Sequence, residues 1–206
     1  IKPSEIIDTF GSDAFRYYFL RAIAFGQDGS FSWEDMTARY TAELANGLGN
    51  LASRATAMVE RYRDGVLPAA HDLTDAEHTI TEALQRTVEV ADDRFGALDF
   101  SAGIVAVKEF VDLVNLYVTE QQPWVLAKDD AQATRLDVVL GTVCEALRAI
   151  AVLHNPVMPK AMSSLWEQLG AEGELGPLAE QRIADVGRWG QLPHGTRVSK
   201  GAALFP

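Results

Sequence analysis

The sequence has one cysteine among its 206 residues and no long uninterrupted apolar run. Cys144 cannot form a disulfide within the chain, and no cluster of cysteine and histidine has the spacing of a zinc site. Charged residues interrupt every apolar stretch well short of the roughly 20 residues that a membrane-spanning helix needs. The N-terminus has no basic segment leading into an apolar one, as a secretion signal would. These absences favour a soluble, cytoplasmic protein that holds no metal and does not enter a membrane.

Basic residues are also scarce, since 18 Lys and Arg stand against 29 Asp and Glu and give a net charge of −11. This balance argues against binding nucleic acid, DNA included, because affinity for a phosphate backbone depends on Lys and Arg. The charge is unevenly spread, however. Residues 71–99 carry eight acidic and two basic side chains, whereas residues 38–63 carry four arginines and two glutamates. Exposed charges act over roughly 8 Å at physiological salt, so the second segment keeps a modest basic character and predicts recognition weighted toward bases rather than phosphates.

Apolar residues make up 48% of the chain, which is enough to bury a core as one domain or as one domain with an attached subdomain. The chain begins at Ile1 rather than at a methionine, and we therefore expect it to be a piece of a longer protein.

Residues 1–31 predict a small connector of mixed α/β structure. Asp13 has the position of an N-cap for a helix over residues 14–21. Residues 25–31, which contain Gly26 and Gly29, predict a turn that leads into a brief extended segment.

Residues 32–170 predict an all-α antiparallel helix bundle. Apolar residues recur at alternating steps of three and four along each expected helix, which is typical of helices that bury one face. Capping residues Ser32, Thr74 and Asp99 mark three helix starts, and Pro123 ends the third helix. A fourth helix is expected from about residue 132 and a short fifth over 161–169. Residues 171–206 are rich in glycine and proline and predict an irregular tail that packs back on the protein.

Two short segments carry the polar and aromatic groups of greatest interest. Asn50 and Arg54 are four residues apart on one side of a helix, with Asn46 on the same flank, and Trp124 follows Pro123. An amide and a guanidinium can bond the edges of unpaired bases, and an indole can stack on them. A structural interpretation competes, in which Arg54 lies over apolar neighbours, Asn50 bonds a backbone carbonyl and Trp124 packs in the core. Spacing alone favours the structural interpretation.

The order of several segments resembles the methionyl-tRNA synthetases, which are class I aminoacyl-tRNA synthetases. The resemblance covers nearly the whole chain and lies in residues 6–18, 26–32, 45–54, 121–124, 155–160 and 200–206. It implies a stem-contact connector over residues 1–31, an anticodon-binding helix bundle over 32–170 and a closing tail over 171–206.

The resemblance also implies a function for the two segments. In this family the matching Asn, Arg and Trp contact the CAU anticodon of tRNA(Met), and the Trp stacks on its first base. The corresponding anticodon-binding residues here are Asn50, Arg54 and Trp124, with Pro123 and Asn46 in support. The implied partners are tRNA(Met) and the N-terminal catalytic domain of the same enzyme, a methionine–tRNA ligase that uses ATP and Mg²⁺. The chain contains neither a HIGH-like nor a KMSKS-like signature, so we expect no catalytic residue and no cofactor in it, and no activity from it alone.

Two alternatives remain at this point. The chain could be a non-catalytic helical protein-interaction module that binds through its acidic segment, or the anticodon-binding domain of another class I synthetase, such as one for cysteine or a branched aliphatic amino acid. The segments over residues 50–54 and 123–124 favour the synthetase for methionine over those for other amino acids.

Overall fold

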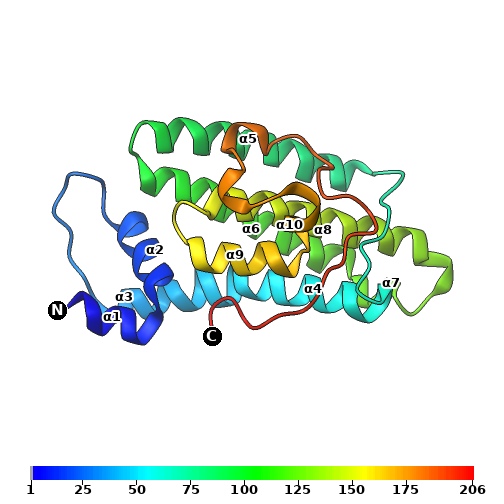
Figure 1. Ribbon diagram of the computed structural model, residues 1–206, viewed down its shortest axis with the longest axis horizontal. Coiled ribbons are helices and arrows are strands. Elements are labelled where there is room, and N and C mark those ends of the chain that lie inside the picture. Colours follow the sequence, from blue (N-terminus) through cyan, green and yellow to red (C-terminus); the bar gives the residue numbers. More distant parts are fainter. Residues whose placement is uncertain (1) are drawn as a thin grey trace.

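The apolar stripes of the sequence form the interior of an elongated helix bundle in the computed structural model, which describes residues 2–206 (Figure 1). A continuous helical rod consists of α3 (Trp33–Arg39), the π-helical η1 (Tyr40–Gly49) and α4 (Asn50–Arg63). The other long helices are α5 (Asp75–Gly96), α6 (Phe100–Gln121) and α8 (Ala133–His154). Helix α5 and the rod lie on opposite sides of α6 and α8 (Figure 1). The predicted all-α bundle is therefore confirmed.

The helices begin where capping groups satisfy their free N–H groups. The Ser32 hydroxyl accepts a hydrogen bond from the Asp35 amide at 3.1 Å, and the Asp99 carboxylate accepts one from the Ala102 amide at 3.2 Å. At the start of α5 the Glu77 carboxylate reaches back to the Thr74 amide at 2.8 Å. These starts agree with the expected ones.

Helix α8 is the centre of the bundle, because every residue from 142 to 154 is buried. It contacts α4, α5 and α6, and also the short helices α7 (Pro123–Leu126) and α9 (Pro159–Gln168). The thiol of Cys144 is fully buried here, and burial raises its pKa to about 12. Even so, no helix within residues 2–206 combines the length and apolar content that crossing a bilayer requires.

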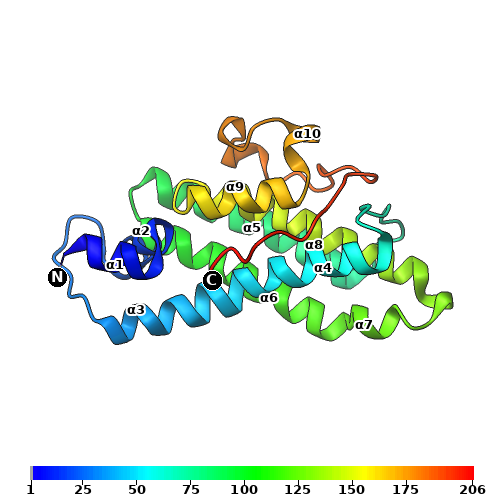
Figure 2. The same ribbon diagram turned by 60° about the horizontal axis from the view of Figure 1, so that its bottom comes forward.

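Two buried charges on α8 hold the C-terminal tail. Glu145 accepts hydrogen bonds from the backbone amides of Gly190, Gln191 and Leu192 at 2.9–3.0 Å. Arg148 pairs with Glu145 at 2.9 Å and donates to the Val186 carbonyl at 3.0 Å. The tail has only short helical pieces, α10 (Ala171–Leu175), η3 (Leu178–Glu180) and η4 (Ile183–Asp185), so these side-chain bonds replace the backbone ladder of a regular element. From there the chain runs back along the rod (Figure 2).

The N-terminal segment differs from the expected mixed α/β connector. It contains α1 (Pro3–Phe10), α2 (Ser12–Ala22) and a loop, and residues 2–206 contain no strand, only an isolated bridge between Val66 and Arg197. Residues 24–30 are exposed, and they form no strand pairing with another segment within residues 2–206. The expected extended segment therefore remains a loop.

Asp13 has a different role from the predicted one. The N-cap of α2 is Gly11, and Asp13 lies inside the helix. Its carboxylate instead accepts a hydrogen bond from the Ala161 amide at 2.7 Å, at the first turn of α9. The aspartate thus caps a helix that is 148 residues away in sequence.

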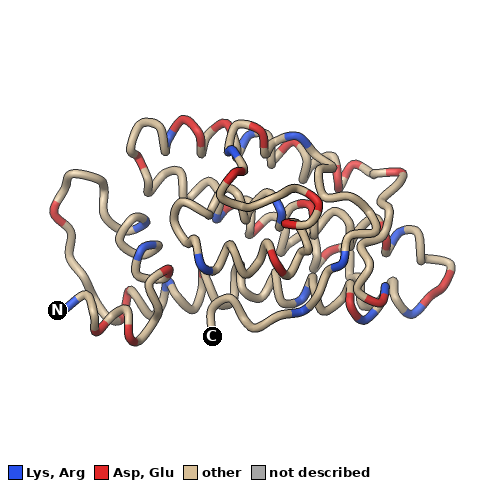
Figure 3. Tube along the Cα trace, in the orientation of Figure 1, with Lys and Arg blue, Asp and Glu red and all other residues tan. Residues whose placement is uncertain are grey.

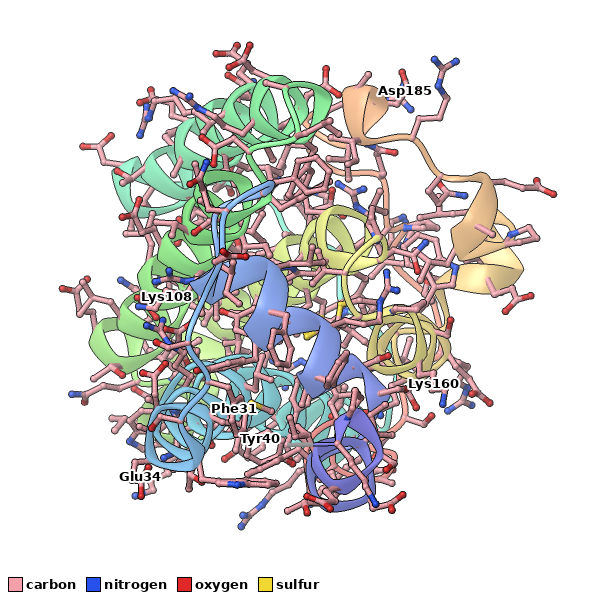
Figure 4. All side chains as sticks on the ribbon, turned by 90° about the vertical axis from the view of Figure 1, so that its left-hand side faces the viewer. Phe31, Glu34, Tyr40, Lys108, Lys160 and Asp185 are labelled. Carbon is pink, nitrogen blue, oxygen red and sulfur yellow. The ribbon has the colours of Figure 1, made fainter. Side chains whose placement is uncertain are left out.

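Aromatic and charged contacts join this N-terminal segment to the rod (Figure 4). Phe31 lies against Trp33 of α3 with 5.2 Å between ring centroids, and Phe10 lies against Tyr40 at 5.1 Å. The Tyr17 hydroxyl donates to Glu43 of η1 at 2.5 Å, and burial with this bond raises the tyrosine pKa far above its ordinary value. Residues 2–32 are thereby packed on the bundle.

We predict that Glu145→Ala lowers the free energy of unfolding by about 3 kcal/mol, because removal of one partner leaves Arg148 buried and unpaired. Urea denaturation followed by circular dichroism measures this, with Glu172→Ala on the exposed face of α10 as the control. A loss below about 1 kcal/mol, as for an exposed ion pair, would contradict the conclusion that Glu145 and Arg148 hold the tail on α8.

Candidate nucleic-acid interface

Arg54 and Trp124, which belong to different helices, meet on one face of the bundle. Arg54 lies on α4 and Trp124 on α7, and the guanidinium carbon is 5.2 Å from the centroid of the indole ring. Both side chains are partly exposed. A cation over an aromatic face at this distance attracts the ring electrostatically, by about 0.5–1 kcal/mol in a solvated setting. The two predicted residues are therefore together and partly accessible to solvent, while Trp124 also packs against the hydrophobic core, as the structural interpretation expects.

The polar groups of the rod that flank this contact have no partners in the protein. Within residues 2–206, the side chains of Asn46, Asn50 and Arg54 make no hydrogen bond to protein groups, and Arg54 forms no ion pair. Asn46 and Asn50 are exposed. The predicted alternative, in which Asn50 bonds a backbone carbonyl, is not seen. These donors and acceptors remain available for a ligand.

The turn after α6 aims Trp124. Gln122 ends α6 in the left-handed conformation, with φ of 48°, and its amide bonds the Val118 carbonyl. Pro123 then begins α7, a position where the missing N–H costs nothing and the ring sets φ for a helix. Pro123 is buried, so its part is to fix the turn and not to touch a ligand directly.

A buried carboxylate anchors the same turn. Arg135 of α8 donates two hydrogen bonds to Glu77, at 2.8 and 2.9 Å, and a third to the side-chain oxygen of Gln121 at 2.5 Å. The Tyr117 hydroxyl also donates to Glu77. Burial alone would raise the pKa of Glu77, but the bonds from Arg135, Tyr117 and Thr74 outweigh it and lower the pKa to about 2. The end of α6 is thus tied to α5 and α8 just before Trp124.

The sequence predicted a regular α-helix along the whole rod, but part of the rod is not α-helical. Residues Tyr40–Gly49 form a π-helix, in which each bond spans five residues instead of four. Gly47 and Gly49 lie in it, and both positions are crowded: a Cβ on Gly49 would be 3.3 Å from the Phe205 ring. Asn50 and Arg54 both lie in α4 and keep their α-helical spacing, but Asn46 lies in the π-helix, so its place on the same flank does not follow from that spacing.

Acidic and basic residues are mixed over the surface, but many of the acidic ones lie along α5, on the side of the bundle away from α4 (Figure 3). Packed helix axes are about 8–10 Å apart, so the intervening layer of α6 and α8 exceeds the screening length of roughly 8 Å. The negative charge of α5 therefore has little effect at Arg54 and Trp124.

Sequence reasoning located Arg54 and Trp124 but missed the residues that position them. No sequence pattern indicated the network of Glu77, Gln121 and Arg135, because a single polar residue on a helix indicates nothing until its neighbours in space are known.

Two protein-family models match adjoining parts of the chain. Residues 1–56 match the family described as tRNA synthetases class I (M). Residues 67–206 match the family described as the anticodon binding domain of methionyl tRNA ligase.

Individual relatives agree with these models. A methionine–tRNA ligase of Streptomyces coelicolor is 57% identical over 209 residues, and one of Halalkalibacterium halodurans is 38% identical over 207 residues. Both alignments include 100% of this chain but only 39% and 31% of the relatives, so the chain spans about a third of their length.

Solved structures show the same fold. The apo form of Mycobacterium tuberculosis methionyl-tRNA synthetase matches with a TM-score of 0.91 and 32% identity, over 100% of this chain and 41% of that one. A structure of the same enzyme bound by methionyl-adenylate also gives a TM-score of 0.91, over 40% of that chain.

The Glu77 network predicts a loss of stability in acid. Because its folded pKa is depressed, Glu77 contributes stability that is full above its ordinary pKa of 4.5 and is lost as the pH falls to about 2. Urea unfolding at a series of pH values measures the slope. Glu77→Gln should flatten the slope in this window and lower stability at pH 7, whereas the exposed Glu82→Gln should do neither. Equal slopes in both variants would contradict the assignment.

Proposed function

Since the chain belongs to the family of the anticodon-binding domain of methionyl-tRNA ligases, we propose that it reads the CAU anticodon of tRNA(Met). It would do so for a cytoplasmic ligase in which another part of the longer protein attaches methionine to the tRNA with ATP. The observation that carries the proposal is the partly exposed contact between Arg54 and Trp124, beside polar side chains that make no hydrogen bond within residues 2–206.

Each residue has a part that its chemistry suits. Trp124 offers an indole face on which the first anticodon base stacks, an interaction that contributes about 1–3 kcal/mol per base. Arg54 and Asn50 present a guanidinium and an amide whose donors bond the edges of unstacked bases. Asn46 adds a further amide on the rod, and Pro123 fixes the direction from which Trp124 approaches.

The guanidinium of Arg54 supports both the stacking of a base and the hydrogen bonding of its edge. It lies over the indole with 5.2 Å between its central carbon and the ring centroid, and it forms no hydrogen bond or ion pair within residues 2–206. A base can then take the place of the guanidinium on the indole face, with the guanidinium beside it. In this arrangement the base meets a pre-positioned donor, and less rotamer entropy is lost on binding.

A second arginine extends the basic surface of α4. Arg61 is exposed, lies 5.7 Å from the centroid of the Tyr62 ring and forms no ion pair within residues 2–206. It is seven residues from Arg54, close to two helical turns, so both arginines are on one side of α4. By contrast, Arg63 is occupied by Asp137 at 2.5 Å. The free pair suits one or two phosphates next to the anticodon bases.

In this proposal, ATP and Mg²⁺ act in another part of the longer protein. Residues 2–206 contain no group of three or more His, Cys, Asp or Glu side chains that could hold a metal ion. No step of the function proposed for this chain passes through either group. The chain's own part is to select the tRNA.

No observation favours the other two functions. A protein-interaction module binding through α5 would leave the free Asn50 and Arg54 side chains unexplained. A synthetase for cysteine or a branched aliphatic amino acid would not account for the matched family.

We expect Trp124→Ala in the full-length protein to raise the Kd for tRNA(Met) about tenfold or more, because one base loses its stacking surface. Titration of fluorescently labelled tRNA measures the Kd. Trp33→Ala is the matched control, since Trp33 is 37% exposed on α3 and stacks on Phe10 away from Arg54. If Trp124→Ala unfolds the protein but anticodon changes leave the Kd of the wild type unaltered, Trp124 is a packing residue and the proposal fails.

Arg54→Lys separates base recognition from phosphate attraction. Lysine keeps the charge but lacks the planar fork that bonds a base edge. We expect this variant to lose discrimination between CAU and transcripts with one altered anticodon base nearly as fully as Arg54→Ala. The ratio of Kd values for the two transcripts measures this discrimination. Arg86→Lys is the control, since Arg86 is exposed on α5. Full discrimination in Arg54→Lys would assign Arg54 to a phosphate instead.

A further inference from the structure

Asn115 connects the two elements that carry the proposed recognition residues. Its side-chain nitrogen donates to the Gly47 carbonyl of η1 at 3.2 Å and to the Val111 carbonyl of its own helix at 3.3 Å. Asn115 is partly buried. Gly47 is three residues before Asn50, and Asn115 is six residues before α6 ends at Gln121. The bond therefore crosses between the rod and α6 close to both halves of the interface.

The bond from Asn115 to Gly47 matters because Gly47 lies in the π-helix. A bond that spans five residues encloses one residue more per turn than an α-helical bond, so residues before Asn50 are rotated relative to a continuous α-helix. Gly47 is buried, and a Cβ there would lie 3.2 Å from the Ala42 carbonyl oxygen inside the same turn. The small residue permits the tight turn, and the Asn115 amide bonds the carbonyl that faces α6.

We propose that Asn115 is a positioning residue for anticodon recognition. By bonding the Gly47 carbonyl, it fixes how the segment from Asn46 to Arg54 is rotated about its helix axis and where it lies along that axis relative to α6. Helix α6 leads directly into the turn that aims Trp124, so the same bond sets the space between Trp124 and the rod in which a base is read. This inference rests on the function proposed above.

Asn115→Ser tests the cross-helix bond selectively. A serine hydroxyl can still bond the carbonyl four residues earlier, at Val111, but is too short to reach Gly47. In the full-length protein, we expect the ratio of Kd values between tRNA(Met) and transcripts with an altered first anticodon base to fall about tenfold. Asn115→Leu, which is similar in size and has no donor, should give a similar fall. Labelled transcripts measure both ratios.

Thr119→Val is the matched control. Thr119 lies one turn nearer Trp124, and its hydroxyl bonds only the Asn115 carbonyl of the same helix. We expect unchanged discrimination and affinity. Methionine-dependent exchange between ATP and pyrophosphate, which needs no tRNA, should remain at the wild-type rate in all three variants.

The outcomes separate this inference from the proposed function. If Trp124→Ala weakens recognition but both folded Asn115 variants keep the full discrimination ratio, the positioning role is wrong and the proposed function stands. If the Asn115 variants lower only the melting temperature, Asn115 is purely structural and the inference is equally overturned. If Trp124→Ala also leaves recognition intact, the proposed function itself is wrong.

Discussion

Burial of the Glu77 carboxylate is the constraint on which the rest of the arrangement depends. A charge without exposed surface costs several kcal/mol unless it is paired and hydrogen-bonded. The compensating donors come from the start of α5, from Tyr117 of α6 and from Arg135 of α8. Because Arg135 also bonds Gln121, these helices must meet in one register for the carboxylate to be satisfied. The turn that presents Trp124 follows from that register.

The same principle acts on the other side of α8. Glu145 and Arg148 are buried and bond the backbone of the tail, which then returns along the rod until Phe205 packs beside Gly49. The Tyr40 hydroxyl bonds the Pro206 carbonyl at 2.6 Å. The π-helix is therefore held by the tail and by Asn115 of α6. A strained helical form persists where surrounding contacts determine it, and such forms are frequent next to functional sites.

Features that depend on neighbours in sequence were predictable, and those that depend on neighbours in space were not. Stripes of apolar residues, the caps at Ser32 and Asp99, and the stop at Pro123 follow from local chemistry. The π-helix does not follow from local chemistry, since glycines in a helical pattern indicate a less stable helix and do not specify a π-helical backbone. Asp13 has the local signature of a cap yet caps a distant helix. For the site, spacing alone could not separate stacking from packing at Trp124, and the contact with Arg54 required the turn at Gln122.

A net charge of −11 is compatible with an RNA-reading domain because affinity and specificity come from different contacts. Phosphate contacts release counterions and strengthen binding to any sequence, whereas base contacts distinguish sequences. Of the four arginines of the rod, Arg39 and Arg63 are paired with carboxylates, whereas Arg54 and Arg61 form no ion pair within residues 2–206 and each lies next to an aromatic ring. Few free cations mean that non-cognate RNA gains little from the backbone. An acidic bundle with two unpaired arginines, each beside a partly exposed aromatic ring, therefore favours discrimination over indiscriminate affinity.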